Sequence, residues 1–164
     1  MLNTENAPRQ GGMKQKARRV LIAGALATSA LLMATPAHAD DTVILRNWET
    51  GLCLDSNHAG EVYAIGCNGG QYQVWNFKND FWATTDIIKD AATGRCLDSN
   101  GAGKVYTLPC NGGPYQSWYT SQNPGHVWRL KNKATGLMLD SNRAGAVYTL
   151  AANGGGNQNW SPKY

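Results

Sequence analysis

The chain is expected to be an all-β protein made of three copies of one unit of about 42 residues. The segment Cys53-Leu54-Asp55-Ser56-Asn57 returns at 96–100, and again at 138–142 with Met138 in place of the cysteine. A second block, Asn-Gly-Gly followed by Gln-x-Trp, also occurs three times, and the equivalent aspartates are 43 and 42 residues apart. A period of this length marks a supersecondary unit that buries its apolar face only against its neighbours.

Residues 1–39 are expected to be a leader. A basic start that includes Arg18-Arg19 runs into an apolar segment from Val20 to Met33 and then into Ala37-His38-Ala39. This order is typical of a signal peptide with a small-x-small cleavage site. The apolar run is about 14 residues, and roughly 20 are needed to cross a bilayer, so no membrane insertion is expected. A signal anchor is the alternative. We expect Met13 to be the true start and ordinary secretion, rather than twin-arginine export, to the extracellular space.

Removing the leader changes the charge of the protein. The full chain has 15 basic and 11 acidic residues, but five basic residues and one acidic residue lie in the leader, so ten of each remain. Nucleic-acid binders usually carry a basic face, and binders of anionic membranes need a polybasic patch. Neither partner is therefore expected. Residues 40–164 have the length of one domain with a single core, and we expect a monomer.

Each copy predicts the same order of strands and turns. The opening strands are residues 43–45, 87–88 and 127–130, and each is followed by a Thr-Gly turn. A short strand (52–54 and its copies) leads into a polar turn that ends in glycine. The next strand begins with Val62-Tyr63, and the Asn-Gly-Gly that follows it predicts a tight reversal, because glycine adopts a positive φ without steric penalty. Gln-x-Trp is expected to begin the last strand.

No long segment of the mature chain shows the 3.6-residue apolar period of a helix. About twelve short strands in three groups of four therefore predict a β-trefoil with pseudo-threefold symmetry. Its repeats are expected at about 41–83, 84–126 and 127–164, all within one domain, 40–164.

The cysteines follow the repeat. Cys53 and Cys67 are 14 residues apart, and so are Cys96 and Cys110, while the third copy lacks both equivalents. Their joint absence predicts bridges within repeats, Cys53–Cys67 and Cys96–Cys110, out of three possible connectivities. Each closed loop would stabilise the fold by about 3 kcal/mol. A metal site is the rival interpretation, but there is no C-x-x-C pair and no recurring histidine, so neither a metal nor a cofactor is expected.

Polar side chains also recur at positions where a core does not require them. A carboxylate accepts strong hydrogen bonds from hydroxyls, an amide both donates and accepts, and a tyrosine ring covers an apolar C–H face. Together these groups suit a neutral sugar, in one site copied three times. The candidate carbohydrate-binding residues are Asp55, Tyr63, Asn68 and Tyr72; Asp98, Tyr106, Asn111 and Tyr115; and Asp140, Tyr148, Asn153 and Asn157.

Several of these positions also have a purely structural interpretation. Asp55 is placed to form an Asx turn, and Asn68-Gly69-Gly70 is a turn sequence. Trp48, Trp82 and Trp128 do not recur, so each either extends one pocket or packs. The recurring tryptophans and leucines are predicted to form the core: Trp75, Trp118, Trp160, Leu54, Leu97 and Leu139.

Three copies that each end in Gln-x-Trp resemble the ricin-B-type β-trefoil lectins. The pattern Leu-Asp-Ser-Asn…Val-Tyr…Asn-Gly-Gly resembles most the actinohivin-like members, which are secreted, three-lobed and bind high-mannose glycans. The resemblance spans essentially the whole mature chain. It implies a trivalent lectin for mannose-terminated glycans or glycoproteins, with one shallow site per repeat formed by the candidate residues above. Asn157 departs from the pattern, because a tyrosine is expected there, and this predicts a weaker third site.

Other function classes fit the residues less well. Glycosidases need two carboxyls roughly 5–10 Å apart, whereas the recurring acids occur once per repeat, so no enzyme is expected. With one carboxylate per site, calcium should not be required. A carbohydrate-binding module for xylan or galactose-type polysaccharides remains an alternative, as does a protein-binding or inhibitor scaffold. The leader adjoining the domain, and an end four residues after Trp160, favour a free-standing protein.

Overall fold

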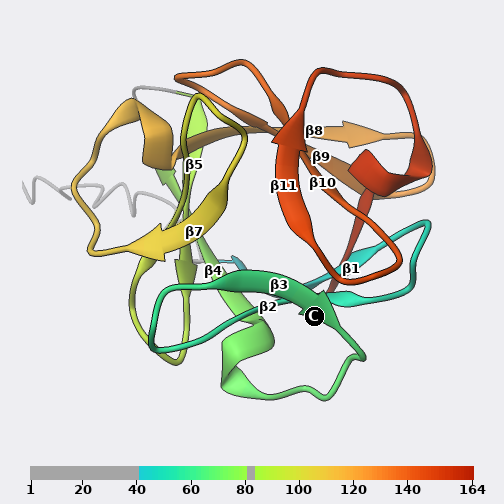
Figure 1. Cartoon of the computed structure of the whole chain (residues 1–164), viewed down its shortest axis with the longest axis horizontal. Coiled ribbons are helices and arrows are strands. Elements are labelled where there is room, and N and C mark those ends of the chain that lie inside the picture. The colour runs from blue at the N-terminus through green and yellow to red at the C-terminus, as the bar shows by residue number, and fades with distance from the viewer. Residues whose placement is uncertain (1–40, 81–83) are drawn as a thin grey trace, which may run out of the picture. The chain divides into compact units, whose positions relative to one another are not determined.

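The computed structural model describes residues 41–80 and 84–164. The predicted leader, including Met13, and Trp82 lie outside the described residues. The first repeat contains β1 (Asp41–Asn47), β2 (Cys53–Ser56), β3 (Val62–Ile65), the 3-10 helix η1 (Gln71–Gln73) and β4 (Val74–Asp80). The second contains β5 (Thr85–Asp90), β6 (Cys96–Ser99), β7 (Val105–Leu108), η2 (Pro114–Gln116) and β8 (Ser117–Asn123). The third contains β9 (Val127–Asn132), β10 (Met138–Ser141), β11 (Val147–Leu150), η3 (Gly156–Gln158) and β12 (Trp160–Lys163) (Figure 1).

Six of these strands close into a barrel. The antiparallel pairs are β1–β4, β4–β5, β5–β8, β8–β9, β9–β12 and β12–β1, so no barrel strand is left with an open edge. The other six strands form three hairpins, β2–β3, β6–β7 and β10–β11. This arrangement is the predicted β-trefoil. Among the described residues, no helix is long and apolar enough to cross a membrane.

The three hairpins contact one another in a ring, and Figure 1 shows β3, β7 and β11 around a common centre. In each contact, a backbone N–H of one hairpin donates to a glycine carbonyl in the turn of another. The three bonds, each 2.8 Å long, run from Thr107 to Gly60, from Thr149 to Gly103 and from Ala64 to Gly145. Gly103 has a φ of +82°, and an added Cβ would lie 2.7 Å from the Thr149 carbonyl oxygen. Only glycine satisfies both constraints without strain.

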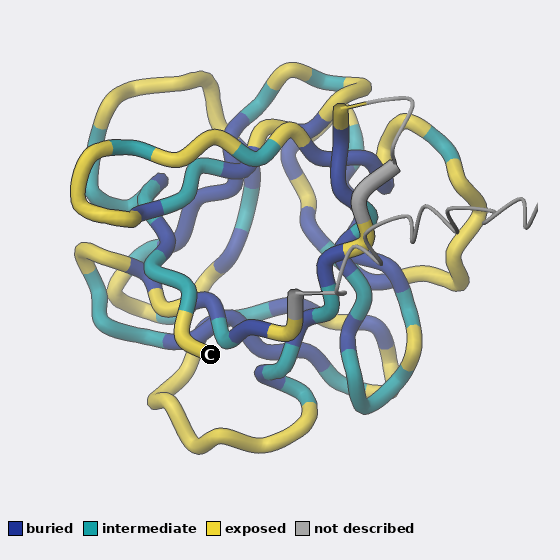
Figure 2. The backbone as a smooth tube through the Cα atoms, turned by 180° about the vertical axis from the view of Figure 1, so that it is seen from behind, coloured by how far each residue is buried: buried dark blue, intermediate teal, exposed yellow. Residues whose placement is uncertain are grey.

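The core contains the predicted tryptophans and leucines, and all six are fully buried. Figure 2 shows that burial is concentrated on the inner strands, while the outer loops are exposed. Each indole N–H donates to a leucine carbonyl of its own repeat, which satisfies a polar group that would otherwise be costly to bury. The bonds run from Trp75 to Leu54 (3.1 Å), from Trp118 to Leu97 (3.0 Å) and from Trp160 to Leu139 (3.1 Å).

The non-recurring tryptophans behave differently from one another. Trp128 is partly buried and packs edge-on against Phe77, with ring centroids 5.1 Å apart. Trp48 is 61% exposed.

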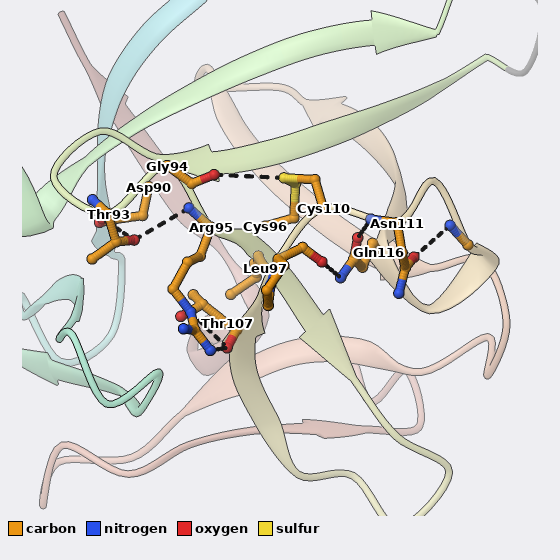
Figure 3. The surroundings of a disulfide bond; sticks show 12 residues. Asp90, Thr93, Gly94, Arg95, Cys96, Leu97, Thr107, Cys110, Asn111 and Gln116 are labelled. Carbon is orange, nitrogen blue, oxygen red and sulfur yellow. Dashed lines mark hydrogen bonds between the residues drawn. A yellow bond between two sulfur atoms is a disulfide. The ribbon is translucent and has the colours of Figure 1, made fainter.

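Both predicted disulfides are present, Cys53–Cys67 and Cys96–Cys110, each with a Cα–Cα distance of 5.1 Å. Figure 3 shows the second bridge beside the loop that carries Asn111. Each bridge therefore ties the start of a hairpin to the loop before a candidate site asparagine. In the third repeat, Met138 is buried at the equivalent position and fills this space without a covalent link.

The last strand begins later than predicted, by one residue in the first two repeats and by two residues in the third. Gln73, Gln116 and Gln158 end short 3-10 helices, and the strand starts only after them. The Gln73 backbone N–H bonds to the Gly70 carbonyl at 2.9 Å, which makes a helical turn instead of a strand ladder. The second strand also extends further than predicted, to Ser56, because Asp55 and Ser56 pair with Tyr63 and Val62.

Candidate functional site

The candidate aspartates and tyrosines form cross-strand pairs on the hairpins. Asp55 lies directly opposite Tyr63, and the other repeats pair Asp98 with Tyr106 and Asp140 with Tyr148. Successive side chains on a strand point to opposite faces. Because the leucine before each aspartate enters the core, the aspartate faces away from it, next to the tyrosine. We name the three sets of candidate residues, one in each repeat, site 1, site 2 and site 3.

The aspartates are nearly enclosed. Asp55, Asp98 and Asp140 are only 4%, 3% and 2% exposed, whereas the facing tyrosines are half-buried. Burial raises the pKa of the Asp98 carboxyl, and its interactions with the Gln116 and Tyr106 side chains act in the opposite direction. A buried carboxyl that has polar partners and also lines an open depression can act as an acceptor for hydroxyl groups.

Site 3 has the same electrostatic pattern. Burial raises the pKa of the Asp140 carboxyl, while interactions with Gln158, Tyr148 and Asn153 act to lower it.

The aspartates affect the pKa of the tyrosines that face them. Burial and then the nearby carboxyl raise the pKa of the Tyr63, Tyr106 and Tyr148 hydroxyls. The tyrosines therefore keep their protons at neutral pH, and their hydroxyls remain donors.

Each candidate asparagine holds its own loop. The Asn111 side-chain oxygen accepts from the Gly113 N–H at 2.7 Å, and the Asn111 N–H donates to Gln116 Oε1 at 2.8 Å. The Gln116 amide in turn donates to the Pro109 carbonyl at 3.2 Å (Figure 3). Sites 1 and 3 repeat this arrangement. The turn uses the asparagine oxygen, which leaves the Nδ2 group for a further contact. In site 3 the Asn153 side chain also interacts with the Asp140 carboxyl.

Site 2 brings all four of its predicted residues together. Asp98, Tyr106, Asn111 and Tyr115 line one open depression of about 290 Å³, together with neighbours that include Gly101. Tyr115 is 48% exposed, so its ring is available to a ligand.

The fourth position differs among the sites. In site 1, the Tyr72 ring meets His58 edge-on, with centroids 5.5 Å apart. In site 3, the Asn157 side chain instead donates to the Ser141 carbonyl and so folds back onto β10.

The recurring glutamine of Gln-x-Trp was not among the residues predicted to form the sites. Gln73, Gln116 and Gln158 are fully buried, and each joins its asparagine loop to the residue just after the preceding strand. Their recurrence was the available signal, because a buried amide needs specific partners.

The described residues contain no group of three histidine, cysteine, aspartate or glutamate side chains suited to a metal ion. Independence from calcium stays a prediction.

Comparison with known families fits this geometry. Residues 41–160 match the model of the ricin-type beta-trefoil lectin domain. The chain belongs to the ricin-type beta-trefoil lectin family. Because one fold can carry different functions, the function of this ricin-type domain has to be argued from the side chains on its hairpins.

Solved structures similar to this ricin-type domain include a designed threefold-symmetric protein, ThreeFoil. It is 26% identical with a TM-score of 0.68, and the match covers 74% of this chain and 96% of that one. SeviL bound to asialo-GM1 saccharide is 18% identical with a TM-score of 0.66, covering 76% and 97%. The exo-beta-1,3-galactanase 1,3Gal43A from Clostridium thermocellum is 23% identical with a TM-score of 0.68, covering 76% and 30%. The last two likenesses show the shared fold.

Proposed function

We propose that the protein is a secreted, monomeric lectin that binds mannose-terminated glycans through sites 1, 2 and 3 and catalyses no reaction. The observation that carries this proposal is the threefold recurrence of an enclosed aspartate directly opposite a half-buried tyrosine. A fixed carboxyl accepts two sugar hydroxyls, the tyrosine ring covers a C–H face, and the asparagine amide donates to a ring substituent.

The family and the fold support carbohydrate binding in general terms. The preference for mannose is supported by the sequence pattern of the three copies, from Leu-Asp-Ser-Asn to Asn-Gly-Gly, and by its resemblance to actinohivin-like lectins. Secretion is supported by the leader sequence and by the two disulfides, which persist in oxidising compartments.

Three separate sites imply multivalent binding. Each set of candidate residues lies on its own hairpin, and the hairpins surround a common centre, which supports three separate sites (Figure 1). Affinity for a single sugar should be weak at each site. A branched glycan or a glycoprotein surface that engages two or more sites gains on the order of 10²–10⁴ in avidity where the spacing permits.

The second candidate function is a carbohydrate-binding module for a galactose-type or other polysaccharide. It is favoured by the structural likeness to the galactanase, in which the matched part is 30% of that chain. A glycan array with the purified mature domain separates the two candidates. Strong signals on terminal mannose support the lectin, and signals only on galactan or xylan support the module.

Titration calorimetry tests the number of sites. Asp55→Asn, Asp98→Asn and Asp140→Asn keep the side-chain volume and remove the charged acceptor. Each is expected to lower the stoichiometry for a mannose oligosaccharide by about one site and to reduce binding to a glycoprotein surface more steeply. Gln122→Ala, at an exposed position on β8, is the matched control. One variant that abolishes all binding while the other two change nothing would refute three sites.

A further inference from the structure

The third repeat departs from the other two at the start of its 3-10 helix. Gly156-Asn157 stands where the other repeats have Gln71-Tyr72 and Pro114-Tyr115. Site 3 therefore lacks the aromatic ring of the fourth position, and Asn157 is turned toward β10. Side chains from another part of the chain occupy the space beside Gly156.

The filling segment comes from the first repeat. β1 pairs with β12, and the Trp48 N–H that follows β1 donates to the Asn159 carbonyl at 2.8 Å. The residues after β1 consequently run alongside η3. If Gly156 carried a Cβ, that atom would lie 2.8 Å from Glu49 Oε2 and 3.5 Å from Trp48 Cδ1. Gly156 does not adopt the positive φ that favours glycine, so its backbone conformation does not require this residue. A glycine at this position instead leaves room for the Glu49 and Trp48 side chains.

Glu49 lies beside Gly156, the residue that precedes the position equivalent to Tyr72. Glu49 Oε1 forms an ion pair with the Arg143 guanidinium at 3.0 Å. Arg143 is the repeat equivalent of His58, and His58 is the residue that the Tyr72 ring contacts. The Glu49–Arg143 pair therefore replaces the tyrosine–histidine contact of site 1, with charged groups in place of rings.

This arrangement is specific to site 3. Ala91-Ala92 occupies the equivalent positions beside η1, and Lys133-Ala134 occupies them beside η2. Their backbones follow the same path, because the Ala91 and Lys133 N–H groups donate to Val74 and Ser117 carbonyls at 2.9 Å. Only the third junction presents an indole and a carboxyl, and that indole is 61% exposed. An exposed indole beside an ion pair is a composition that suits a ligand-binding surface.

We propose that site 3 is a composite sugar site, in which Trp48 and Glu49 of the first repeat complete the set of Asp140, Tyr148 and Asn153. Trp48 supplies the aromatic surface that Asn157 lacks. Glu49, which pairs with Arg143, supplies a second carboxyl acceptor that sites 1 and 2 do not have. Site 3 thus selects a neutral sugar by a different set of hydroxyls. The inference rests on the proposed lectin function.

The test isolates site 3. In an Asp55→Asn/Asp98→Asn background, site 3 is the remaining site, and binding of a mannose oligosaccharide is measured by calorimetry and by tryptophan fluorescence. Trp48→Ala is expected to weaken binding about three- to tenfold and to abolish the ligand-induced fluorescence change. Glu49→Gln keeps the shape of the side chain and is expected to weaken binding by a similar factor.

Lys133→Ala is the matched control, because Lys133 is the site 2 equivalent of Trp48, and it should leave site 3 unchanged. Thermal unfolding of every variant verifies that it is folded. The composite site is refuted if the double variant binds no sugar while the wild type binds at sites 1 and 2. It is also refuted if Trp48→Ala and Glu49→Gln leave the affinity of the double variant unchanged. Neither result contradicts the proposed lectin function. A wild-type protein that binds no glycan overturns both proposals.

Discussion

The side-chain amide of Asn47 donates a 2.7 Å hydrogen bond to the backbone carbonyl of Asn157, 110 positions further along the chain. The second interface between repeats has the same bond, from Asn132 to the Tyr115 carbonyl at 2.7 Å. At the third interface the equivalent residue is Asp90, which is fully buried and cannot donate in this way when ionised. Its Oδ2 atom has no hydrogen-bond partner among the described residues.

Asp90→Asn is therefore expected to stabilise the protein. The new amide would donate to the Tyr72 carbonyl, as Asn47 and Asn132 do at their interfaces, while the side-chain oxygen keeps its bond from the Thr93 N–H. The gain should be about 1 kcal/mol, or about 4 °C in Tm by calorimetry. The reverse changes, Asn47→Asp and Asn132→Asp, should each lower the Tm. A lower Tm for Asp90→Asn would show that the carboxyl has a favourable partner of its own.

Gln116→Ala is expected to damage site 2 without removing any of its four candidate residues. The buried amide holds the Asn111 N–H and the Pro109 carbonyl, and its loss leaves both groups unsatisfied. The domain should lose about 1–3 kcal/mol in denaturant unfolding. Stoichiometry for the oligosaccharide should fall by about one site, since the Asn111 loop is no longer fixed. Binding at full stoichiometry in a destabilised protein would assign Gln116 a purely structural role.

Glycan binding at sites 2 and 3 should weaken on mild acidification. Burial raises the pKa of the Asp98 and Asp140 carboxyls, so they become protonated at a higher pH than an exposed aspartate. Protonation removes a charged acceptor, and affinity is expected to fall as the pH drops from about 7 toward 4. Calorimetry in the Asp55→Asn background measures this loss directly.

The same two groups affect stability in the opposite sense. A carboxyl whose pKa is higher in the folded than in the unfolded state contributes most to stability below its unfolded pKa, and that contribution is lost as the pH rises through the folded value. Protonation of Asp98 and Asp140 therefore favours the folded domain while it weakens binding. If circular dichroism showed that the domain unfolds over the same pH range in which it loses binding, the predicted opposite effects on binding and stability would be wrong.

Removing one disulfide should cost stability in its own repeat. Cys53→Ala/Cys67→Ala and Cys96→Ala/Cys110→Ala are each expected to lower the free energy of unfolding by about 3 kcal/mol, by the loop-closure argument. Both pairs have the same separation of 14 residues, so similar losses are expected. Reduction of the wild type provides the control, and its effect should approach the sum of the two. Equal stability of reduced and oxidised protein would contradict the prediction.

Sequence periodicity predicted the fold well because the repeat carries strong local signals. The strand Val62–Ile65 begins at the predicted residue, and Gly51 and Gly69 have the positive φ expected of their turns. The 3-10 helix at Gln71–Gln73 was not predicted, because a single three-residue turn is too short to show a hydrophobic period.

The candidate site was predictable only where it repeats. Asp98 and Tyr106 recur and do face each other, and Trp118 is in the core as expected. Trp48 and Glu49 do not recur, and their proximity to Gly156 depends on the pairing of β1 with β12. Contacts between the first and last strands of a closed barrel are remote in sequence, and no local pattern records them.

The ring of hydrogen bonds through Gly60, Gly103 and Gly145 needs three lobes but not one continuous chain. A peptide of a single repeat would carry one donor and one acceptor that its own hairpin cannot satisfy. Such a peptide could satisfy both groups by assembling as a trimer, in which the N–H of each copy donates to the glycine carbonyl of another. The hydrogen bonds that join three repeats within this chain could therefore also join three separate copies of one repeat, whose assembly would then depend on concentration.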